Sequence, residues 1–263
     1  FCMEGITSLR IKAQKAFIEE AYKMKKFNQY QIKILMALLM VTDHLNHVPG
    51  LIPDSLAMIF HVLTRCVGVW FAYGAVEGVI YSHNIQRYIL RLYGAAAVMF
   101  AGSKLLEILF VAKNILISNN IFLTLALGVT MPSALKYIKN KPLSYLVAVA
   151  AFSVGFIVTE GGSIVLPFML ISYYTYKKPV IRNACYFVLS IILFAGSFVP
   201  YETIAATISM LAYNSDFMFI LVIPFLYMYN GEHGPHTNFS KYFFYVFYPA
   251  HLWLLATIAY YVS

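Results

Sequence analysis

Long apolar segments alternate with short polar ones along almost the whole chain. The continuous apolar segments are residues 32–48, 55–81, 88–111, 120–135, 143–158, 163–176, 181–199 and 242–262. Residues 203–229 are apolar too, but Asn214-Ser215-Asp216 interrupts them, which predicts one broken span or two short ones. Because a spanning helix needs about 20 mainly apolar residues, we expect an all-α, polytopic helical membrane bundle of about eight to ten transmembrane helices.

Composition supports this class. Of the 263 residues, 61% are hydrophobic and 11% are charged, whereas soluble domains carry about 25% charged residues. Residues 28–263 therefore predict a single transmembrane domain. Residues 1–27 predict a basic amphipathic segment at the cytoplasmic face, helical over about 5–26, with a mobile leader as the alternative. Glu19, Glu20 and Lys23 argue against a cleavable signal peptide.

The net charge of +8 lies mainly in loops. The basic clusters are Lys23, Lys25 and Lys26; Arg87 and Arg91; Lys136, Lys139 and Lys141; and Lys177, Lys178 and Arg182. The positive-inside rule makes these loops and the amino terminus cytoplasmic, and places 49–54, 112–119, 159–162 and 200–202 outside. Lys241 favours placing loop 230–241 inside, and the side of the carboxyl terminus stays open. This distribution argues against nucleic-acid binding.

The three cysteines, Cys2, Cys66 and Cys185, show neither metal-ligand spacing nor a disulfide framework, so no metal site is expected.

Titratable residues gather at the outer end of the first span, where Asp43, His44 and His47 follow one another. Asp43 and His47 are four residues apart and share a helical face, and His44 adjoins His47. An aspartate beside an imidazole supplies what general-base catalysis needs, a proton acceptor near neutral pH and a carboxylate to orient it. We expect Asp43 to orient His44; the alternative is that these residues cap the helix at the headgroups.

Charged residues inside a span cost about 2.5–3.5 kcal/mol, so each needs a partner or a function. In the second span His61 and Arg65 are four residues apart and align. Helical rise places Arg65 about 14 Å and Asp43 about 8 Å below the outer ends of their spans, which is compatible with an Asp43–Arg65 pair. That pair could serve the site or only lock two helices. Lys104 and Glu107, three apart, are expected to neutralise each other.

Near the other face, Arg87 and Arg91 lie four residues apart at a helix start, beside His83 and Asn84. Two guanidinium groups on one helical face suit phosphates arriving from the cytoplasm. The alternative is ordinary topology-setting charge.

The tail carries a second candidate feature. Tyr229-Asn230-Gly231 follows the broken apolar stretch, and irregular backbone at membrane depth is tolerated only where protein buries it or it lines a cavity. His251 lies near the middle of the last span, and Pro249 could kink that helix so that His251 points inward. The alternatives are an interfacial aromatic belt over Tyr242–Tyr248 and a structural role for His251.

Several of these motifs, taken in order, resemble the TraX family of integral membrane pilin acetylases, over about Gln31 to Leu255. They are Thr42-Asp43-His44; Arg65 with Glu77-Gly78; His83-Asn84 and Arg87-Tyr88; Asn120–Leu125 with Gly128; Tyr229-Asn230-Gly231; and Lys241–Leu252. Two positions depart from the family pattern. Residues 65–71, which end at Phe71, contain no proline, whereas the family usually places a proline before a phenylalanine in this segment. Glu160-Gly161-Gly162 stands where an aspartate followed by a glycine is expected.

The resemblance implies transfer of an acetyl group from acetyl-CoA, as co-substrate, to an amine near the outer face of a bacterial inner membrane. The acceptor would be the amino terminus of a pilin-like or other exported peptide. More distantly, the chain resembles the transmembrane acyltransferases, including heparan-alpha-glucosaminide N-acetyltransferase and the acyltransferase-3 enzymes. The expected catalytic residues are His44, Asp43, His47 and Arg65. Those expected to bind the co-substrate are Glu77, His83, Asn84, Arg87, Arg91, Tyr229, Asn230, Lys241 and His251.

Two other functions remain open. A proton-coupled transporter or exporter would also place Asp, His, Glu and Arg inside the membrane. Transporters often have paired repeats with matching broken helices, whereas this sequence has one candidate break, near Asn214. The second possibility is a structural assembly factor.

Overall fold

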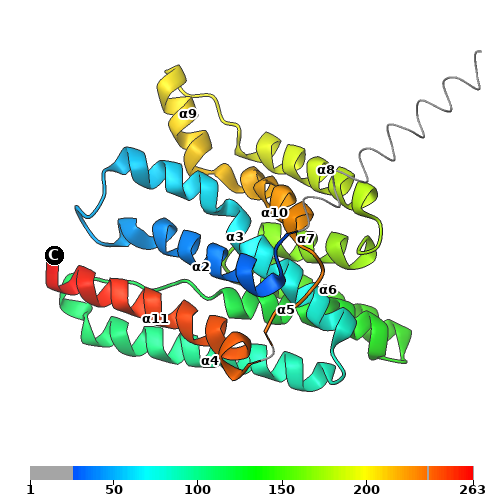
Figure 1. Ribbon diagram of the computed structural model, residues 1–263. Helices are drawn as coiled ribbons and strands as arrows, with labels where there is room; N and C mark the ends of the chain where they lie inside the picture. The colour runs from blue at the N-terminus through cyan, green and yellow to red at the C-terminus, as the bar shows by residue number, and fades with distance from the viewer. Residues whose placement is uncertain (1–25, 236, 263) are drawn as a thin grey trace, which may run out of the picture.

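The computed structural model describes residues 26–235 and 237–262, and this part of the chain is a bundle of α-helices (Figure 1). It contains no strand, only one isolated backbone bridge between Phe27 and Tyr229. The fold class expected from the apolar pattern is confirmed. The amphipathic helix expected over 5–26 falls outside the described residues except at Lys26.

Ten α-helices follow one another in the described residues. They are α2 (Gln29–His44), α3 (Asp54–Tyr81), α4 (Ile85–Leu109), α5 (Ile121–Tyr137), α6 (Lys141–Val158), α7 (Gly162–Tyr174), α8 (Pro179–Ser197), α9 (Ile204–Tyr213), α10 (Val222–Met228) and α11 (Asn238–Val262). Three short 3₁₀ helices complete the order, namely η1 (Leu45–His47), η2 (Val111–Lys113) and η3 (Ser215–Leu221). Each expected apolar segment contains a helix, and the break expected at 214–216 separates α9 from η3.

Polar side chains determine where several helices begin. Asn28, Asn84, Asn140 and Thr203 each accept a hydrogen bond from a backbone N–H in the first turn of α2, α4, α6 and α9. These N-cap bonds satisfy donors that would otherwise be lost at the start of a helix.

Within the described residues, five helices are long and apolar enough to cross a membrane, namely α3, α4, α6, α8 and α11. A sixth span results if α9 and residues 215–228, which are bent by 59°, count as one. The difference from the expected eight to ten lies in α2, α5 and α7, which have 16, 17 and 13 residues. α5 and α7 are apolar but short, and other helices bury most of their side chains.

Helix α3 lies at the centre of the bundle, where it contacts α2, α5, α7, α9 and η3. Its residues between Thr64 and Val79 are largely buried. By contrast, α4, α6 and α8 expose large apolar side chains, among them Leu90, Ile157 and Ile191. Exposed apolar surface of this extent is expected where a helix faces lipid.

The bundle has two ends. We call the end with loops 82–84, 138–140, 175–178 and 229–237 the basic face, and the end with loops 45–53, 110–120 and 159–161 the opposite face. Loop 229–237 joins the basic face because Gln29 N donates to Glu232 O at 2.8 Å. Helix α11 then crosses to the opposite face, where Tyr260 stacks on Phe110 at 4.6 Å between ring centroids. Loop 230–241 therefore lies with the basic loops, as Lys241 suggested, and the carboxyl terminus lies at the other end.

A double glycine reverses the chain between α6 and α7. Gly161 has a φ of +63°, in the left-handed region that favours glycine. A Cβ at Gly162 would lie 2.0 Å from the carbonyl oxygen of Gly155, and the Thr124 hydroxyl donates to the carbonyl oxygen of Glu160 at 2.8 Å. This turn therefore holds Glu160 in a defined place against α5.

The close contact at Gly162 predicts that alanine destabilises the protein more at Gly162 than at Gly196. Gly162→Ala should destabilise the protein by about 1–3 kcal/mol, because the methyl group would overlap backbone atoms that cannot move independently. Gly196→Ala in α8 is the matched control, since no atom lies within 4 Å of its would-be Cβ. Thermal unfolding in detergent measures both; equal melting temperatures for the two variants would contradict the tight turn.

Candidate active site

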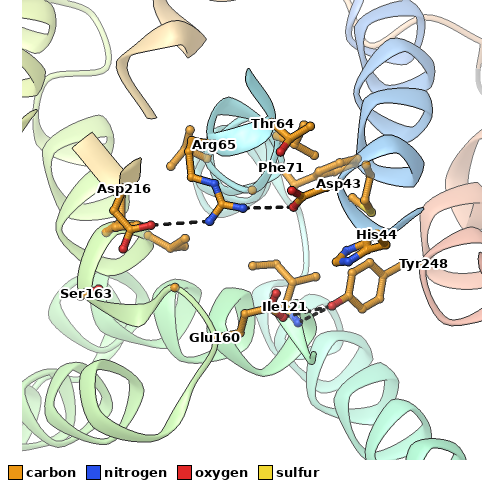
Figure 2. A pocket seen from close by; sticks show the side chains of 17 residues that line it. Asp43, His44, Thr64, Arg65, Phe71, Ile121, Glu160, Ser163, Asp216 and Tyr248 are labelled. Atoms are coloured by element: carbon orange, nitrogen blue, oxygen red, sulfur yellow. Dashed lines mark hydrogen bonds and ion pairs between the residues drawn. The ribbon is translucent and has the colours of Figure 1, made fainter. Parts of the chain in front are cut away.

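A cavity of about 340 Å³ opens near the opposite face (Figure 2). Its walls come from α2, α3, the start of α5, the α6–α7 turn, η3 and α11. The polar side chains that line it are Asp43, His44, Thr64, Arg65, Glu160, Ser163, Asp216 and Tyr248. Three carboxylates therefore share this cavity with a single guanidinium.

Arg65 joins two elements across this cavity. Its Nη2 donates to Asp43 Oδ2 at 3.1 Å, and its Nη1 lies 3.6 Å from Asp216 Oδ1. The Nε–H donates to the carbonyl oxygen of His61 at 3.0 Å. The Asp43–Arg65 pair that helical depth predicted is thus confirmed, and Asp216 is an additional partner.

His44 is buried, with 7% of its surface exposed, and it lines the cavity. Its imidazole makes no hydrogen bond with any residue that the structure describes, and the ring lies 4.9 Å from that of His47. Asp43 does not orient it. Consecutive residues of a helix point about 100° apart, and Asp43 faces Arg65 and also His61, whose Nδ1 lies 3.6 Å from its Oδ1. The expected contact of His44 with His47 is confirmed, but His47 does not line the cavity.

His251 brings the last helix to the same place. Its ring centroid lies 5.4 Å from that of His44, so it lies beside an expected catalytic residue, and it lines neither of the two cavities at the basic face described below. His251 Nδ1 donates to the carbonyl oxygen of Phe247 at 3.0 Å, which leaves Nε2 as the acceptor nitrogen. This Nε2 is buried and has no hydrogen-bond partner among the described residues.

Glu160 is a lining residue that sequence reasoning did not assign to the site. Its Oε2 accepts a hydrogen bond from the Tyr248 hydroxyl at 3.2 Å, and its Oε1 accepts one from Asn119 Nδ2 at 2.7 Å. Glu160 is accessible from the cavity, but surrounding protein limits its hydration and so raises the pKa of its carboxyl, against the lowering effect of these two hydrogen bonds. The signal in the sequence was a charge directly before two glycines. Asp216, at the break in 203–229, was also missed.

Two adjoining cavities, of about 550 and 260 Å³, enter from the basic face. Both are lined by Lys33, Arg91 and Lys241, together with Gln29 and Tyr88. Arg91 and Lys241 were expected here, whereas Lys33 was missed. Three cationic side chains around one opening make the electrostatic potential there positive, which favours anions.

Gly78 makes room for part of this lining. A Cβ at Gly78 would lie 2.6 Å from the ring of Tyr88. Glycine at this position therefore allows the Tyr88 ring to lie directly against α3, where it forms one wall of both cavities.

The other residues expected to bind the co-substrate lie elsewhere or have their polar groups occupied. Arg87 lines neither cavity. Asn84 caps α4 through the backbone N–H of Arg87, at 2.9 Å, and with His83 it borders a separate cavity of about 460 Å³ against α5. Both side-chain groups of Asn230 bond to Glu232.

Glu77 is a structural tie between distant segments. It is buried, with 2% exposure. Oε1 accepts from the Tyr176 hydroxyl at 2.7 Å, and Oε2 accepts from Gln29 Nε2 at 2.8 Å and from the Tyr229 hydroxyl at 3.1 Å. The carboxylate borders the larger cavity, but its acceptors are already used.

Lys104 and Glu107 neutralise each other as expected, with Nζ 2.5 Å from Oε2. In the described part of the chain, no group of three or more His, Cys, Asp or Glu side chains is arranged to hold a metal ion.

Comparison with known proteins gives one match. The family model described as "TraX protein" matches residues 28–259, which is nearly the whole chain. No curated protein and no solved structure matches.

The Arg65 ion pair predicts a non-additive effect on stability. Arg65→Met should cost on the order of 3 kcal/mol, because it leaves Asp43 partly buried without its cation. The double variant Asp43→Asn/Arg65→Met should recover much of this loss, since no unpaired charge then remains at Asp43. Unfolding in detergent of both single variants and the double variant tests this; strictly additive losses would show that the pair is not coupled.

Proposed function

The chain belongs to the TraX family, and from this premise we propose that it is an acetyltransferase of a bacterial inner membrane. It takes the acetyl group from acetyl-CoA at the basic, cytoplasmic face and transfers it to an amine at the opposite face, the amino terminus of a pilin-like or other exported peptide. The observation that carries the proposal is the pair of cavities that approach each other from the two ends of the bundle, one lined by three cations and the other by His44.

The basic-face cavities suit the donor. Lys33, Arg91 and Lys241 are positioned to bind its phosphates through charge-assisted hydrogen bonds. Along α3, the rise from Gly78 to Arg65 is about 20 Å, comparable with the length of an extended pantetheine arm. A donor held by its phosphates at the basic face could therefore present its thioester near His44.

The opposite-face cavity suits the acceptor and the chemistry. Glu160 and Asp216 attract the acceptor as an ammonium ion, which loses its extra proton to solvent. The neutral amine nitrogen then attacks the thioester carbonyl; the C–N bond forms, and the C–S bond breaks with its electron pair going to sulfur. His44 takes one of the two protons on the nitrogen and delivers it to the sulfur, so the products are the N-acetyl acceptor, which keeps one N–H, and the free thiol.

Arg65 and His251 assist in this scheme. Arg65 is the guanidinium in the cavity and stabilises the oxyanion that forms on the thioester oxygen, while Asp43 holds Arg65 in place. His251 packs beside His44 and keeps a free acceptor nitrogen there.

The alternative of a proton-coupled exporter has less support. Exporters of this kind often contain broken helices in matching positions of two repeats. In residues 26–235 and 237–262 there is one bent pair, α9 with residues 215–228.

Removing His44 should abolish the transfer. His44→Ala should reduce acetyl transfer by about 10²–10⁴-fold, because the attacking amine loses its proton acceptor. The assay follows labelled acetyl from acetyl-CoA to an amine-bearing peptide in vesicles that contain the purified protein. His47→Ala is the control, since His47 contacts His44 but does not line the cavity, and it should lose less. Near-normal turnover of His44→Ala would refute this role.

Charge reversal at Arg91 and at Arg87 of α4 should have different effects on the affinity for acetyl-CoA. Arg91→Glu should weaken acetyl-CoA binding and make the remaining affinity less sensitive to salt, because a phosphate partner is lost. Arg87→Glu is one turn away, outside both cavities, and should leave the affinity unchanged. Calorimetry with acetyl-CoA at two salt concentrations measures both. Equal losses would mean that only the general charge of the basic face matters.

A further inference from the structure

The two cavities that approach each other inside the bundle are separated by one residue. Phe71 of α3 is the only side chain that lines both the 340 Å³ cavity and the 260 Å³ cavity in the described residues. Its ring stacks on Phe244 of α11, with ring centroids 3.9 Å apart and an interplanar angle of 19°. Both residues are buried.

A third ring packs against this stacked pair. Phe122 of α5 meets Phe244 edge to face at 5.2 Å between centroids, and it is also buried. We call Phe71, Phe122 and Phe244 the aromatic septum. Rings from three helices thus pack together where Phe71 separates the two cavities, and the stacking at 3.9 Å leaves no room for another group between Phe71 and Phe244.

About one helical turn on either side of Phe71, α3 carries a glycine. Gly68, three residues before it, lines the opposite-face cavity, and Gly74, three residues after it, lines the basic-face cavity. A Cβ at Gly68 would have a single neighbour within 4 Å, at 3.9 Å, so there is free space beside it. A Cβ at Gly74 would lie 3.2 Å from Gln29 Nε2, so the free space beside α3 is on the Gly68 side, and Phe71 closes it at one level.

We propose that the acyl thioester crosses the bundle at the aromatic septum, and that Phe71 and Phe244 determine which acyl chain lengths are transferred. This inference rests on the proposed function. The donor's acyl group must displace the two stacked rings to reach His44, and the displacement needed grows with each added methylene. A hydrophobic site distinguishes chains that differ by one methylene by about 10–200-fold, so the septum selects for the two-carbon acetyl group.

The first experiment compares donors of different length. Wild-type protein should transfer acetyl from acetyl-CoA far faster than butyryl from butyryl-CoA. Phe71→Ala should raise the butyryl-to-acetyl rate ratio by at least about tenfold, because a narrower side chain leaves a wider passage. Phe71→Leu is the milder variant if Phe71→Ala does not fold. The matched control is Phe156→Ala, which lies on the exposed surface of α6 and should keep the wild-type ratio. An unchanged ratio in active Phe71 variants overturns the proposal.

The second experiment does not depend on catalysis. Cys2, Cys66 and Cys185 are replaced by serine, and Ser163, which lines the opposite-face cavity, is replaced by cysteine. In sealed vesicles of uniform orientation, a membrane-impermeant thiol reagent is added from the basic face. The reagent should label the cysteine introduced by Ser163→Cys at least about tenfold faster when Phe71→Ala is also present than when Phe71 is kept. This is expected if the Phe71 ring is the barrier that excludes the reagent.

The two experiments fail in different ways. Absence of transfer from every acyl-CoA in the wild-type protein would refute the proposed function, whereas faster labelling of the Phe71→Ala variant would still support the septum as the barrier. Equal labelling rates with and without Phe71 would refute the septum even if acetyl transfer were established.

Discussion

Helix α3 carries an arginine and a glutamate twelve residues apart, and an apolar bundle can hold both only if other segments satisfy them. Over this distance the helix rises about 18 Å. Arg65 is neutralised by Asp43 of α2 and Asp216 of η3. Glu77 is satisfied by Gln29 at the start of α2 and by tyrosines that follow α7 and α10. These bonds hold α2 and the segment 215–229 against α3 at two levels. The opposite-face cavity forms beside Arg65, and the larger basic-face cavity forms beside Glu77.

The short helices complete the opposite-face cavity. Helices α5 and α7 are too short to meet the length requirement for a span, and the α6–α7 turn, bound by Thr124 of α5, contributes Glu160 to the cavity wall. Close packing there depends on small residues, since a Cβ at Gly128 would lie 2.2 Å from the sulfur of Met169. Membrane helices approach closely where such residues meet. Close packing and the hydrogen bond from Thr124 together place a carboxylate, Glu160, in the cavity wall.

The sequence predicts the parts of this structure that depend on local pattern. Apolar length predicts the helices, and the depths of Asp43 and Arg65 in their helices are compatible with the ion pair that they form. The number of spans was not predictable in this way, because apolar length alone does not distinguish a helix in lipid from one enclosed by protein. The orientation of His44 was also not predictable, since Arg65 and His61 compete for Asp43 from another helix. Lys33, Glu160 and Asp216 come from three separate elements, and only the packing of those elements shows which of their side chains share a cavity. Packing also distinguishes Arg87 from Arg91. The two lie one turn apart on α4, and only Arg91 lines the basic-face cavities.

The ties of α3 also constrain how the protein is made. As the chain is synthesised from its amino terminus, Asp43 enters the membrane before Arg65, so this pair can form as soon as both helices are inserted. Glu77 has Gln29 as an early donor, but Tyr176 is made 99 residues later and Tyr229 152 residues later. Until then α3 holds an acidic side chain whose acceptors are mostly unsatisfied in an apolar setting, which is costly. Insertion intermediates that end before Tyr176 are therefore the least stable stage of biogenesis. Completion of the broken segment after α9 then secures the helices that were inserted first.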